Sequence, residues 1–396
     1  MTAPAFSRDE ASGRQISGFD HLVYLRVFEG CNLHCLHCFI PANPRRMKMD
    51  DIRAVPRLLQ GRVEPGAVVL LQWHGGEPTL MGSKFIREGI REIKKHGVDY
   101  IWKFGIQTNL VNFDKSWIPL YQEEFSGEVG VSWDPEIRLL NRHALESSSE
   151  YNRLFDDRLS ILVESGLKPH VVTTATKTLF KHFRNPFDFF LHWIVRGVSS
   201  VHLERVTRTG HARENWNAVG LCNAEYSRHM SRWMRAYYLL RSRRKELNNL
   251  HVSPFDDLAA SVKSLANGKP KANGCWSGNC DMRFHTIDAD GYKPGCTAIT
   301  SEIGNRNAHH QLDLGEDIRS FRDSRIFDCR NCKYRPICSS GCLALDFDDG
   351  SGECSGGYGL LETASELERE FDFETGARQM RGARRKMSLK PDYAPP

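Results

Sequence analysis

Residues 21–39 read HLVYLRVFEGCNLHCLHCF, and this stretch decides how the rest of the chain is interpreted. Its first eight residues form an apolar segment with β-branched side chains, which is typical of a buried strand. Directly after it come three cysteines with the spacing CxxxCxxC, namely Cys31, Cys35 and Cys38. Thiolates bind iron in iron–sulfur clusters, and a [4Fe–4S] cube normally takes four of them. Three cysteines in one loop therefore predict a cluster with one iron open to another ligand.

A zinc site is the alternative for these cysteines, because His34 and His37 lie in the same loop. Zinc motifs usually present pairs of cysteines, or cysteines combined with histidines at their own spacings. We expect the two histidines to be loop residues that flank the cluster.

Five further apolar segments follow, with patterns compatible with helices between them. The predicted strands are His21–Phe28, Ala67–Trp73, Tyr100–Gln107, Glu128–Trp133, Pro169–Thr174 and Ser200–Val206. The predicted helices cover about 49–60, 83–96, 115–124, 150–165, 186–196 and 223–247. This alternation predicts βαβ units and a parallel sheet. Six units give an α/β fold with a partial (β/α)6 TIM-like barrel, where chemistry belongs at the carboxyl ends of the strands.

After residue 248 the pattern changes to a connector with one short helix, and then to a small, loop-rich segment with many cysteines. We expect an N-terminal extension over 1–20, the barrel over 21–248, the connector over 249–274 and an iron–sulfur domain over 275–360. A C-terminal helix (Leu360–Phe371) and a basic tail complete the chain over 361–396.

Composition favours a cytoplasmic protein of 396 residues, because no apolar run spans a bilayer and the N-terminus lacks an apolar signal region. In a reducing compartment, the 12 cysteines indicate metal ligands rather than disulfides. The net charge of +5 is mild. Basic residues concentrate at 241–245 and at 378–390, where we expect a solvated helix end and a solvated tail.

The spacing CxxxCxxC followed by the aromatic Phe39, at the end of the first strand of a partial barrel, resembles the signature of radical S-adenosylmethionine (SAM) enzymes. The resemblance implies that the amino and carboxylate groups of SAM chelate the open iron. It further implies that one-electron reduction cleaves SAM to methionine and a 5′-deoxyadenosyl radical, which abstracts a substrate hydrogen. The cofactor then carries the difficult chemistry, and the protein positions it.

Three strand ends resemble the SAM-binding segments of this family. Gly75-Gly76-Glu77-Pro78 is similar to the GGEP motif at the SAM amino group, with two glycines for close backbone approach. Gln107-Thr108-Asn109 and Ser132-Trp133-Asp134 are similar to segments that line the site, with Ser132 and Asp134 at ribose-contacting positions. The family commonly has glycine after that aspartate, where this chain has Pro135. Thr173 and Thr174 are expected to be buried strand residues. The expected cofactor contacts are Phe39, Gly75, Gly76, Glu77, Gln107, Asn109, Ser132 and Asp134.

Eight downstream cysteines are enough for two further [4Fe–4S] clusters, with a pair of zinc sites as the alternative. The run CxxCx5CxxxC, preceded by Gx4C and followed by one more cysteine, resembles the SPASM extension of some radical SAM enzymes. The resemblance implies a nearer auxiliary cluster on Cys275, Cys280, Cys296 and Cys342, and a farther one on Cys329, Cys332, Cys338 and Cys354. Full thiolate ligation suits electron transfer or structural roles. Cys222 is expected to be an ordinary free cysteine.

SPASM enzymes commonly modify peptides or proteins, so the resemblance implies a maturase that oxidatively modifies or crosslinks a ribosomally synthesised peptide. In the sulfatase-maturating branch an aspartate follows the Gx4C cysteine, and Thr297 at that position argues against formylglycine formation by that mechanism. The alternatives are a non-peptide substrate, such as a nucleic acid base or a sugar-like metabolite, and a non-catalytic iron–sulfur or zinc protein. The short N-terminus leaves no room for a separate leader-binding domain, so we expect a peptide substrate to be held either by the barrel and SPASM surfaces or by a separate leader-binding partner. A flavodoxin or ferredoxin is the expected electron donor.

Overall fold

Nine strands in the described part of the chain form one curved sheet with the order β7-β6-β5-β4-β3-β2-β1-β8-β9. The structure is a computed structural model that describes residues 18–40, 45–141, 143–243, 249–280, 282–300 and 316–371. Neighbouring strands pair in parallel, except that β9 returns antiparallel to β8. The strands are β1 (His21–Phe28), β2 (Val68–Gly75), β3 (Ile101–Thr108), β4 (Glu128–Ser132), β5 (Lys168–Ala175), β6 (Ser200–Arg205), β7 (His251–Ser253), β8 (Phe284–Asp288) and β9 (Gly291–Pro294).

The α/β class and the partial barrel are confirmed, and the first six strands follow the predicted segments to within two residues. Three strands are additional. β7 comes from the expected connector, whereas β8 and β9 come from the stretch expected to form the iron–sulfur domain. Three residues are too few for β7 to show a periodic pattern. β8 is buried almost throughout, but His285 and Asp288 conceal its strand character in the sequence. The sheet therefore takes in residues well beyond 248.

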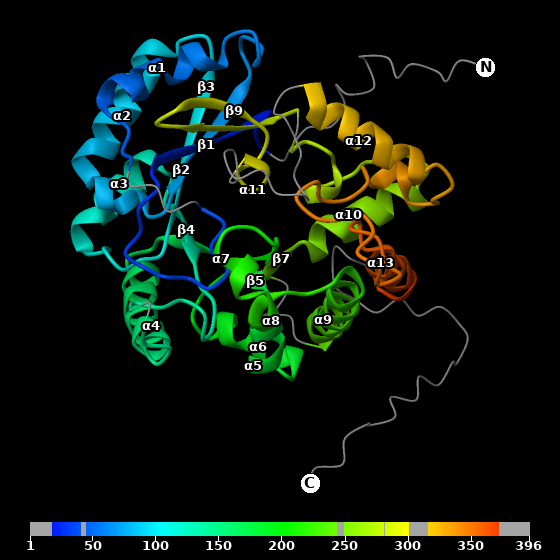
Figure 1. The fold of residues 1–396 in the computed structure, drawn as a ribbon. Helices are drawn as coiled ribbons and strands as arrows, with labels where there is room; N and C mark the ends of the chain where they lie inside the picture. The colour runs from blue at the N-terminus through cyan, green and yellow to red at the C-terminus, as the bar shows by residue number, and fades with distance from the viewer. Residues whose placement is uncertain are drawn as a thin grey trace.

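Helices cover the outer face of the sheet, while α12 and α13, coloured gold to red, lie on the opposite side from α1, α2 and α3 (Figure 1). Each predicted helical range holds a helix, and residues 244–248 lie outside the described part. The unpredicted helices α5, α7, α8 and α11 have six residues or fewer, whereas α12, also unpredicted, has 13. The helices are α1 (Met49–Leu59), α2 (Ser83–His96), α3 (Ile118–Glu124), α4 (Ser147–Glu164), α5 (Lys177–His182), α6 (Pro186–Ile194), α7 (His211–Glu214), α8 (Trp216–Val219), α9 (Asn223–Arg243), α10 (Phe255–Ala266), α11 (Thr297–Thr300), α12 (Glu316–Asp328) and α13 (Tyr358–Glu370).

Strand β2 shows how the outer face of the sheet is packed. Val69, Leu71 and Trp73 are fully buried and alternate with half-buried residues, as the period of two in a strand requires. A Cβ atom at Gly89 of α2 would lie 2.6 Å from the Trp73 ring. The glycine therefore makes room for the indole, and α2 can lie close against the sheet.

The alternate residues of the same strands face the inside of the barrel. On β2 these include Gln72 and His74, and on β6 they include His202 and Glu204, all of them half-buried or partly exposed. The carboxyl ends of the parallel strands meet at one edge of the sheet. The loops after β1, β2, β3 and β4 gather at this edge and position the candidate site.

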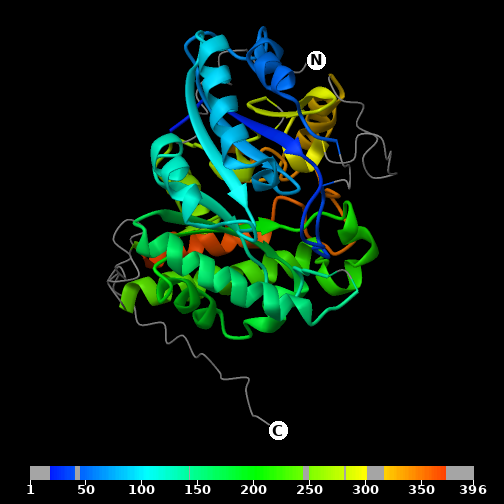
Figure 2. The same cartoon turned by 90° about the vertical axis from the view of Figure 1, so that its left-hand side faces the viewer.

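The C-terminal helix α13 packs on α9 and α10, which the turned view shows as red beside green (Figure 2). Asn223, the first residue of α9, fastens the loop before α13. Its backbone N donates to Asp349 Oδ2 at 2.6 Å, and its Nδ2 donates to the carbonyl oxygens of Asp346 and Glu353 at 3.2 and 3.1 Å. These bonds hold the end of the cysteine-rich segment against the barrel.

The expectation of a solvated helix end at 241–245 is wrong for Arg241. This side chain is only 9% exposed, and its Nη1 lies 3.1 Å from Asp256 Oδ1. Helix α10 places Asp256 next to the end of α9, so the Arg241 side chain is buried in an ion pair with it. Residues 244 and 245 and the basic tail at 378–390 lie outside the described residues.

Candidate active site

Cys31, Cys35 and Cys38 lie in the loop that leaves β1 at the carboxyl edge of the sheet. The three thiols are close enough for their charges to influence one another. Burial raises the pKa of Cys35 and of Cys38, which disfavours the thiolate form. Thiolates here therefore need positive charge beside them, and the iron of a cluster supplies it.

Two glycines bring the end of β2 against the residues that precede the cysteine loop. The backbone N of Gly76 donates to Phe28 O at 2.8 Å, and that of Glu77 donates to Gly30 O at 3.1 Å. A Cβ atom at Gly75 would lie 2.2 Å from Phe28 O, and one at Gly76 would lie 2.3 Å from Gly30 O. Gly75 also has a φ of 131°, which side chains rarely permit. Only glycines allow this approach.

The Glu77 carboxylate is a buried junction between the ends of β2 and β3, with 1% of the residue exposed. Its Oε1 accepts hydrogen bonds from Thr79 N at 3.0 Å, Thr79 Oγ1 at 2.6 Å and Thr108 Oγ1 at 2.9 Å. Its Oε2 accepts one from Asn109 N at 2.8 Å. Burial raises the pKa of Glu77 in spite of these bonds. Glu77 therefore positions the two loops and does not present a free carboxylate.

We expect the substitution Glu77→Gln to lower the free energy of unfolding by about 1–3 kcal/mol and to weaken SAM binding. An amide offers one acceptor oxygen where the carboxylate offers two, so at least one buried donor loses its partner. Urea unfolding under anaerobic conditions and calorimetric titration with SAM measure the two effects. Glu88→Gln, at an exposed position on α2, is the matched control and leaves both unchanged. A free energy of unfolding equal to that of the parent would show that the hydrogen bonds of Glu77 do not stabilise the fold.

Asn109 links the end of β3 to the cysteine loop. Its Nδ2 donates to Asn32 Oδ1 at 2.8 Å and lies 3.7 Å from Cys31 Sγ. Phe39, at the other end of the loop, is half-buried. Two of the expected cofactor contacts thus lie directly on the cysteine loop.

Gln107 and Ser132 lie side by side on β3 and β4 and face the inside of the barrel. Gln107 Nε2 donates to Ser132 Oγ at 2.8 Å, and Tyr151 of α4 donates its hydroxyl to Ser132 O at 2.7 Å. A Cβ atom at Gly130 would lie 2.3 Å from Gln107 Oε1. The bare backbone of Gly130 therefore lets the glutamine side chain cross to the neighbouring strand.

Asp134 has no exposed surface, and both of its carboxylate oxygens have partners in this chain. Oδ1 accepts from Thr174 N at 2.5 Å and from Thr173 Oγ1 at 3.1 Å. Oδ2 lies 2.7 Å from Arg138 Nη2 and 3.3 Å from His37 Nε2. The structure therefore does not place Asp134 with Ser132 as an open ribose contact. The two threonines are buried, as expected.

The loop after β6 supports the cysteine loop from the opposite side, and sequence reasoning missed it. His211 N donates to Cys38 O at 2.8 Å, and a Cβ atom at Gly210 would lie 2.3 Å from the same oxygen. His211 Nδ1 lies 3.3 Å from Cys35 O. A glycine and a histidine in a loop are too common to have signalled this contact.

The four cysteines expected to hold the nearer auxiliary cluster lie together. The charge of Cys275 interacts with those of Cys280, Cys296 and Cys342, and the thiol of Cys296 interacts with those of Cys280 and Cys342. An apolar shell of Ile299, Ile318, Leu343 and Ala344 packs against three of these cysteines. Arg322 of α12, which sequence reasoning did not single out, places Nη2 at 2.8 Å from Cys280 Sγ.

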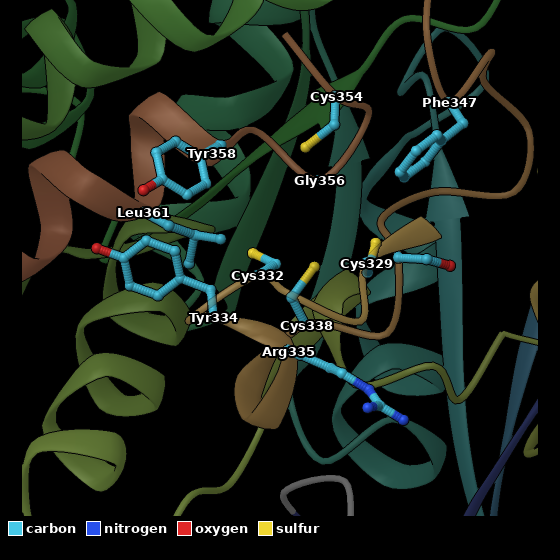
Figure 3. Close-up of a pocket in the computed structure, with 11 residues that line it drawn as sticks. Cys329, Cys332, Tyr334, Arg335, Cys338, Phe347, Cys354, Gly356, Tyr358 and Leu361 are labelled. Atoms are coloured by element: carbon cyan, nitrogen blue, oxygen red, sulfur yellow. The ribbon is translucent and has the colours of Figure 1, made fainter. Parts of the chain in front are cut away.

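The four cysteines expected to hold the farther cluster line one pocket. Figure 3 shows the sulfur atoms of Cys329, Cys332, Cys338 and Cys354 around a common space, with Tyr334, Tyr358 and Leu361 on one side and Phe347 on the other. Burial raises the pKa of Cys338 to about 12, so this thiol too needs a cation to become a ligand.

Within the described residues, no three His, Cys, Asp or Glu side chains are grouped so that they could hold one metal ion. A [4Fe–4S] cube would spread its thiolates over separate irons, and the four cysteines around the pocket of Figure 3 are the candidate ligands of one such cluster.

Two other cysteine-related predictions concern single residues. Thr297 follows Cys296 as the first residue of α11 and is 6% exposed, so no carboxylate stands at this position. Cys222 lies beside Glu225, whose backbone N lies 3.4 Å from the Cys222 sulfur.

In the portion of the chain that the structure describes, no helix combines the length and the apolar character needed to cross a bilayer.

Residues 25–134 match the model of the Radical SAM superfamily. The cysteine-type anaerobic sulfatase-maturating enzyme of Clostridium novyi is 25% identical over 333 residues, which cover 79% of this chain and 84% of that protein. The enzyme of the same description from Clostridium perfringens is 23% identical over 341 residues, covering 79% and 86%.

Among solved structures, native anSMEcpe with bound AdoMet and Cp18Cys peptide superposes with a TM-score of 0.62 at 17% identity, over 88% of this chain and 96% of that one. Streptococcus suis SuiB bound to the precursor peptide SuiA gives a TM-score of 0.54 at 15% identity, over 85% and 74%. At these identities the likeness shows the fold.

The fold, the cysteine loop and the superfamily match together define the class: the chain is a radical SAM enzyme. The superfamily match and the AdoMet-bound neighbour support SAM and a [4Fe–4S] cluster as cofactors. Within this class it is similar in sequence to the anaerobic sulfatase-maturating enzymes and shares their fold. The prediction of a radical SAM enzyme is thus confirmed.

Proposed function

We propose that this chain is a maturase that oxidatively modifies or crosslinks a ribosomally synthesised peptide with the help of three [4Fe–4S] clusters. The observation that carries the proposal is the gathering of cysteines in the fold into one set of three and two sets of four. Cys31, Cys35 and Cys38 would hold the cluster that binds SAM. Cys275, Cys280, Cys296 and Cys342 would hold a second cluster, and Cys329, Cys332, Cys338 and Cys354 a third.

A peptide substrate is supported by the proteins that share this fold. One of them was solved with a Cp18Cys peptide and another with its precursor peptide SuiA. Thr297 in place of a carboxylate favours a reaction other than formylglycine formation through an aspartate at this position. A separate leader-binding protein would help to present the peptide, and a flavodoxin or ferredoxin would supply electrons.

When bound and reduced, the first cluster supplies the electron that cleaves SAM to methionine and a 5′-deoxyadenosyl radical. The chain itself holds the reactants in place. Gly75 and Gly76 bring the β2 loop to the cysteine loop, and Glu77 fixes that loop to the end of β3. Gln107 and Ser132 line the inner face of the barrel beside it. These residues would orient SAM before the reaction, which is the part of catalysis that positioning contributes.

The inside of the barrel between the cysteine sets is the proposed entry for the target side chain of the peptide. Glu204 of β6 is 45% exposed there and lies 3.0 Å from His202 Nε2. Its charge interacts with Tyr24 of β1 and with Cys275. The lumen thus offers polar contacts between the proposed SAM site and the nearer auxiliary cysteines.

Deuterium transfer tests the proposed function. The anaerobically reconstituted enzyme is incubated with SAM, a low-potential reductant and a perdeuterated candidate peptide, such as a cysteine- or aromatic-rich peptide encoded beside this gene. We expect deuterium in 5′-deoxyadenosine and a peptide product that has lost two hydrogens, both read by mass spectrometry. The unlabelled peptide is the control. Deuterium transfer from a nucleoside or sugar, with none from peptides, would replace the proposal with the non-peptide alternative.

A further inference from the structure

Arg138 is a buried arginine that reaches the cysteine loop, and neither the family motifs nor the proposed function accounts for it. It lies four residues after Asp134 and is 9% exposed. Its Nε and Nη2 lie 2.8 and 2.7 Å from Asp134 Oδ2. Its remaining terminal nitrogen, Nη1, lies 3.8 Å from Cys35 Sγ, in the range of a hydrogen bond to sulfur. One edge of the planar guanidinium therefore pairs with the Asp134 carboxylate. Its third nitrogen, Nη1, is directed at the sulfur of a proposed cluster ligand.

The backbone fixes Arg138 opposite Cys35. On one side of the cysteine, His34 N donates to Leu139 O at 2.8 Å, and on the other, Leu36 N donates to Ile137 O at 3.0 Å. Residues 34–36 and 137–139 therefore run along each other, with Cys35 and Arg138 in their centres. Two backbone hydrogen bonds and the ion pair with Asp134 leave the guanidinium little freedom to turn away.

Asp134 in turn is held by partners that do not belong to the cysteine loop. Thr173 and Thr174 of β5 donate to its Oδ1. Its Oδ2 also lies 3.3 Å from His37 Nε2. Arg138 thus stands between Asp134 and Cys35, with Nη1 directed at the Cys35 sulfur and Nε and Nη2 directed at the carboxylate.

Cluster potentials depend on hydrogen bonds to the sulfur ligands, on nearby charge and on solvent exposure. A donor and a positive charge beside a thiolate stabilise the reduced cluster, which carries one more negative charge than the oxidised one. Because the pair is buried, water screens this effect little. Both contributions have the same sign and raise the potential.

We propose that Arg138 is a positioning residue for the SAM-binding cluster, which donates a hydrogen bond to Cys35 and raises the reduction potential of that cluster. The inference rests on the proposed function, because it takes Cys31, Cys35 and Cys38 as the ligands. It assigns Asp134, in place of a ribose contact, the task of holding Arg138.

A redox titration monitored by electron paramagnetic resonance tests this inference on the reconstituted full-length enzyme without SAM. The signal of the cluster at Cys35 is identified by its change when SAM is added afterwards. We expect Arg138→Met to lower the equilibrium constant for reduction about tenfold, which is 59 mV for a one-electron couple. Arg138→Lys keeps the charge and gives a smaller shift. Arg241→Met removes an equally buried arginine that pairs with Asp256 elsewhere in the fold, and its midpoint matches the parent.

Several outcomes decide the matter. A parent-like midpoint in Arg138→Met, or an equal shift in Arg241→Met, overturns the inference. An unchanged midpoint with weaker SAM binding overturns it in favour of a direct contact between Arg138 and SAM. If Arg138→Met does not fold, the double variant Asp134→Asn with Arg138→Met removes both charges, and a lowered midpoint there supports the inference. A parent enzyme with no SAM-sensitive cluster signal would instead contradict the proposed ligands.

Discussion

Replacing Cys31, Cys35 and Cys38 together with alanine is expected to abolish SAM cleavage and to remove about one third of the bound iron. The three thiols lie in one loop at the carboxyl edge of the sheet and influence one another's charge. Alanine offers no ligand, so the loop loses all three thiolates of the proposed cluster. Without the cluster, no electron reaches SAM, so 5′-deoxyadenosine formation falls to the background of the reductant alone.

The measurements are iron and sulfide content after anaerobic reconstitution, and 5′-deoxyadenosine by liquid chromatography. Cys222→Ala is the matched control, because this cysteine contacts Glu225 at the start of α9 and is not one of the proposed ligands. We expect Cys222→Ala to keep full iron content and full SAM cleavage. Retained cleavage in the triple variant would mean that the CxxxCxxC loop does not hold the catalytic cluster.

Replacing Cys329, Cys332, Cys338 and Cys354 with alanine is expected to remove another third of the iron and to abolish peptide modification while SAM cleavage continues. All four line one pocket, so their loss empties the proposed third cluster site. The SAM-binding loop is built from other residues, after β1, and keeps its ligands. The segments that line the pocket are then no longer joined by a shared cluster, and we expect a clear drop in the melting temperature of the variant.

Metal analysis separates this prediction from its alternative. The parent enzyme is expected to bind about 12 iron atoms, and the quadruple variant about 8, since each [4Fe–4S] cluster carries four. Zinc bound by the parent enzyme and lost from the quadruple variant, with no change in iron, would assign this pocket to a zinc site. Cys222→Ala again serves as the control for the loss of a cysteine as such.

Glu77 and Asp134 show that a residue of the expected type can have a role other than the one its motif predicts. Glu77 and Asp134 were both expected to contact SAM, because each lies at a strand end in a segment that resembles a family motif. In the fold, Glu77 accepts four hydrogen bonds from Thr79, Thr108 and Asn109. Asp134 is enclosed by β5 and Arg138. Both carboxylates organise the loops of the site, and each joins its own segment to a neighbouring strand: Glu77 to the end of β3 and Asp134 to β5.

Local sequence determined the class of this protein and the sites of its strands. The apolar pattern of each of the first six strands can be recognised within a short segment of sequence, and so can the spacing of Cys31, Cys35 and Cys38. Local patterns suffice here because side-chain direction in a strand depends only on position along it. The close approach of β2 to the cysteine loop was also foreseeable from Gly75 and Gly76, since only glycine tolerates such contacts.

Tertiary structure alone decided which residues meet. It brought β7 and β8 into the sheet, placed Arg138 against Cys35, and turned Arg241 into the core beside Asp256. It also brought cysteines up to 67 positions apart, from Cys275 to Cys342, near enough for their charges to interact. A sequence states which donors and acceptors a chain carries. Their partners are chosen when loops from different strands converge and buried polar groups must be satisfied, and that choice is made across the fold rather than along the chain.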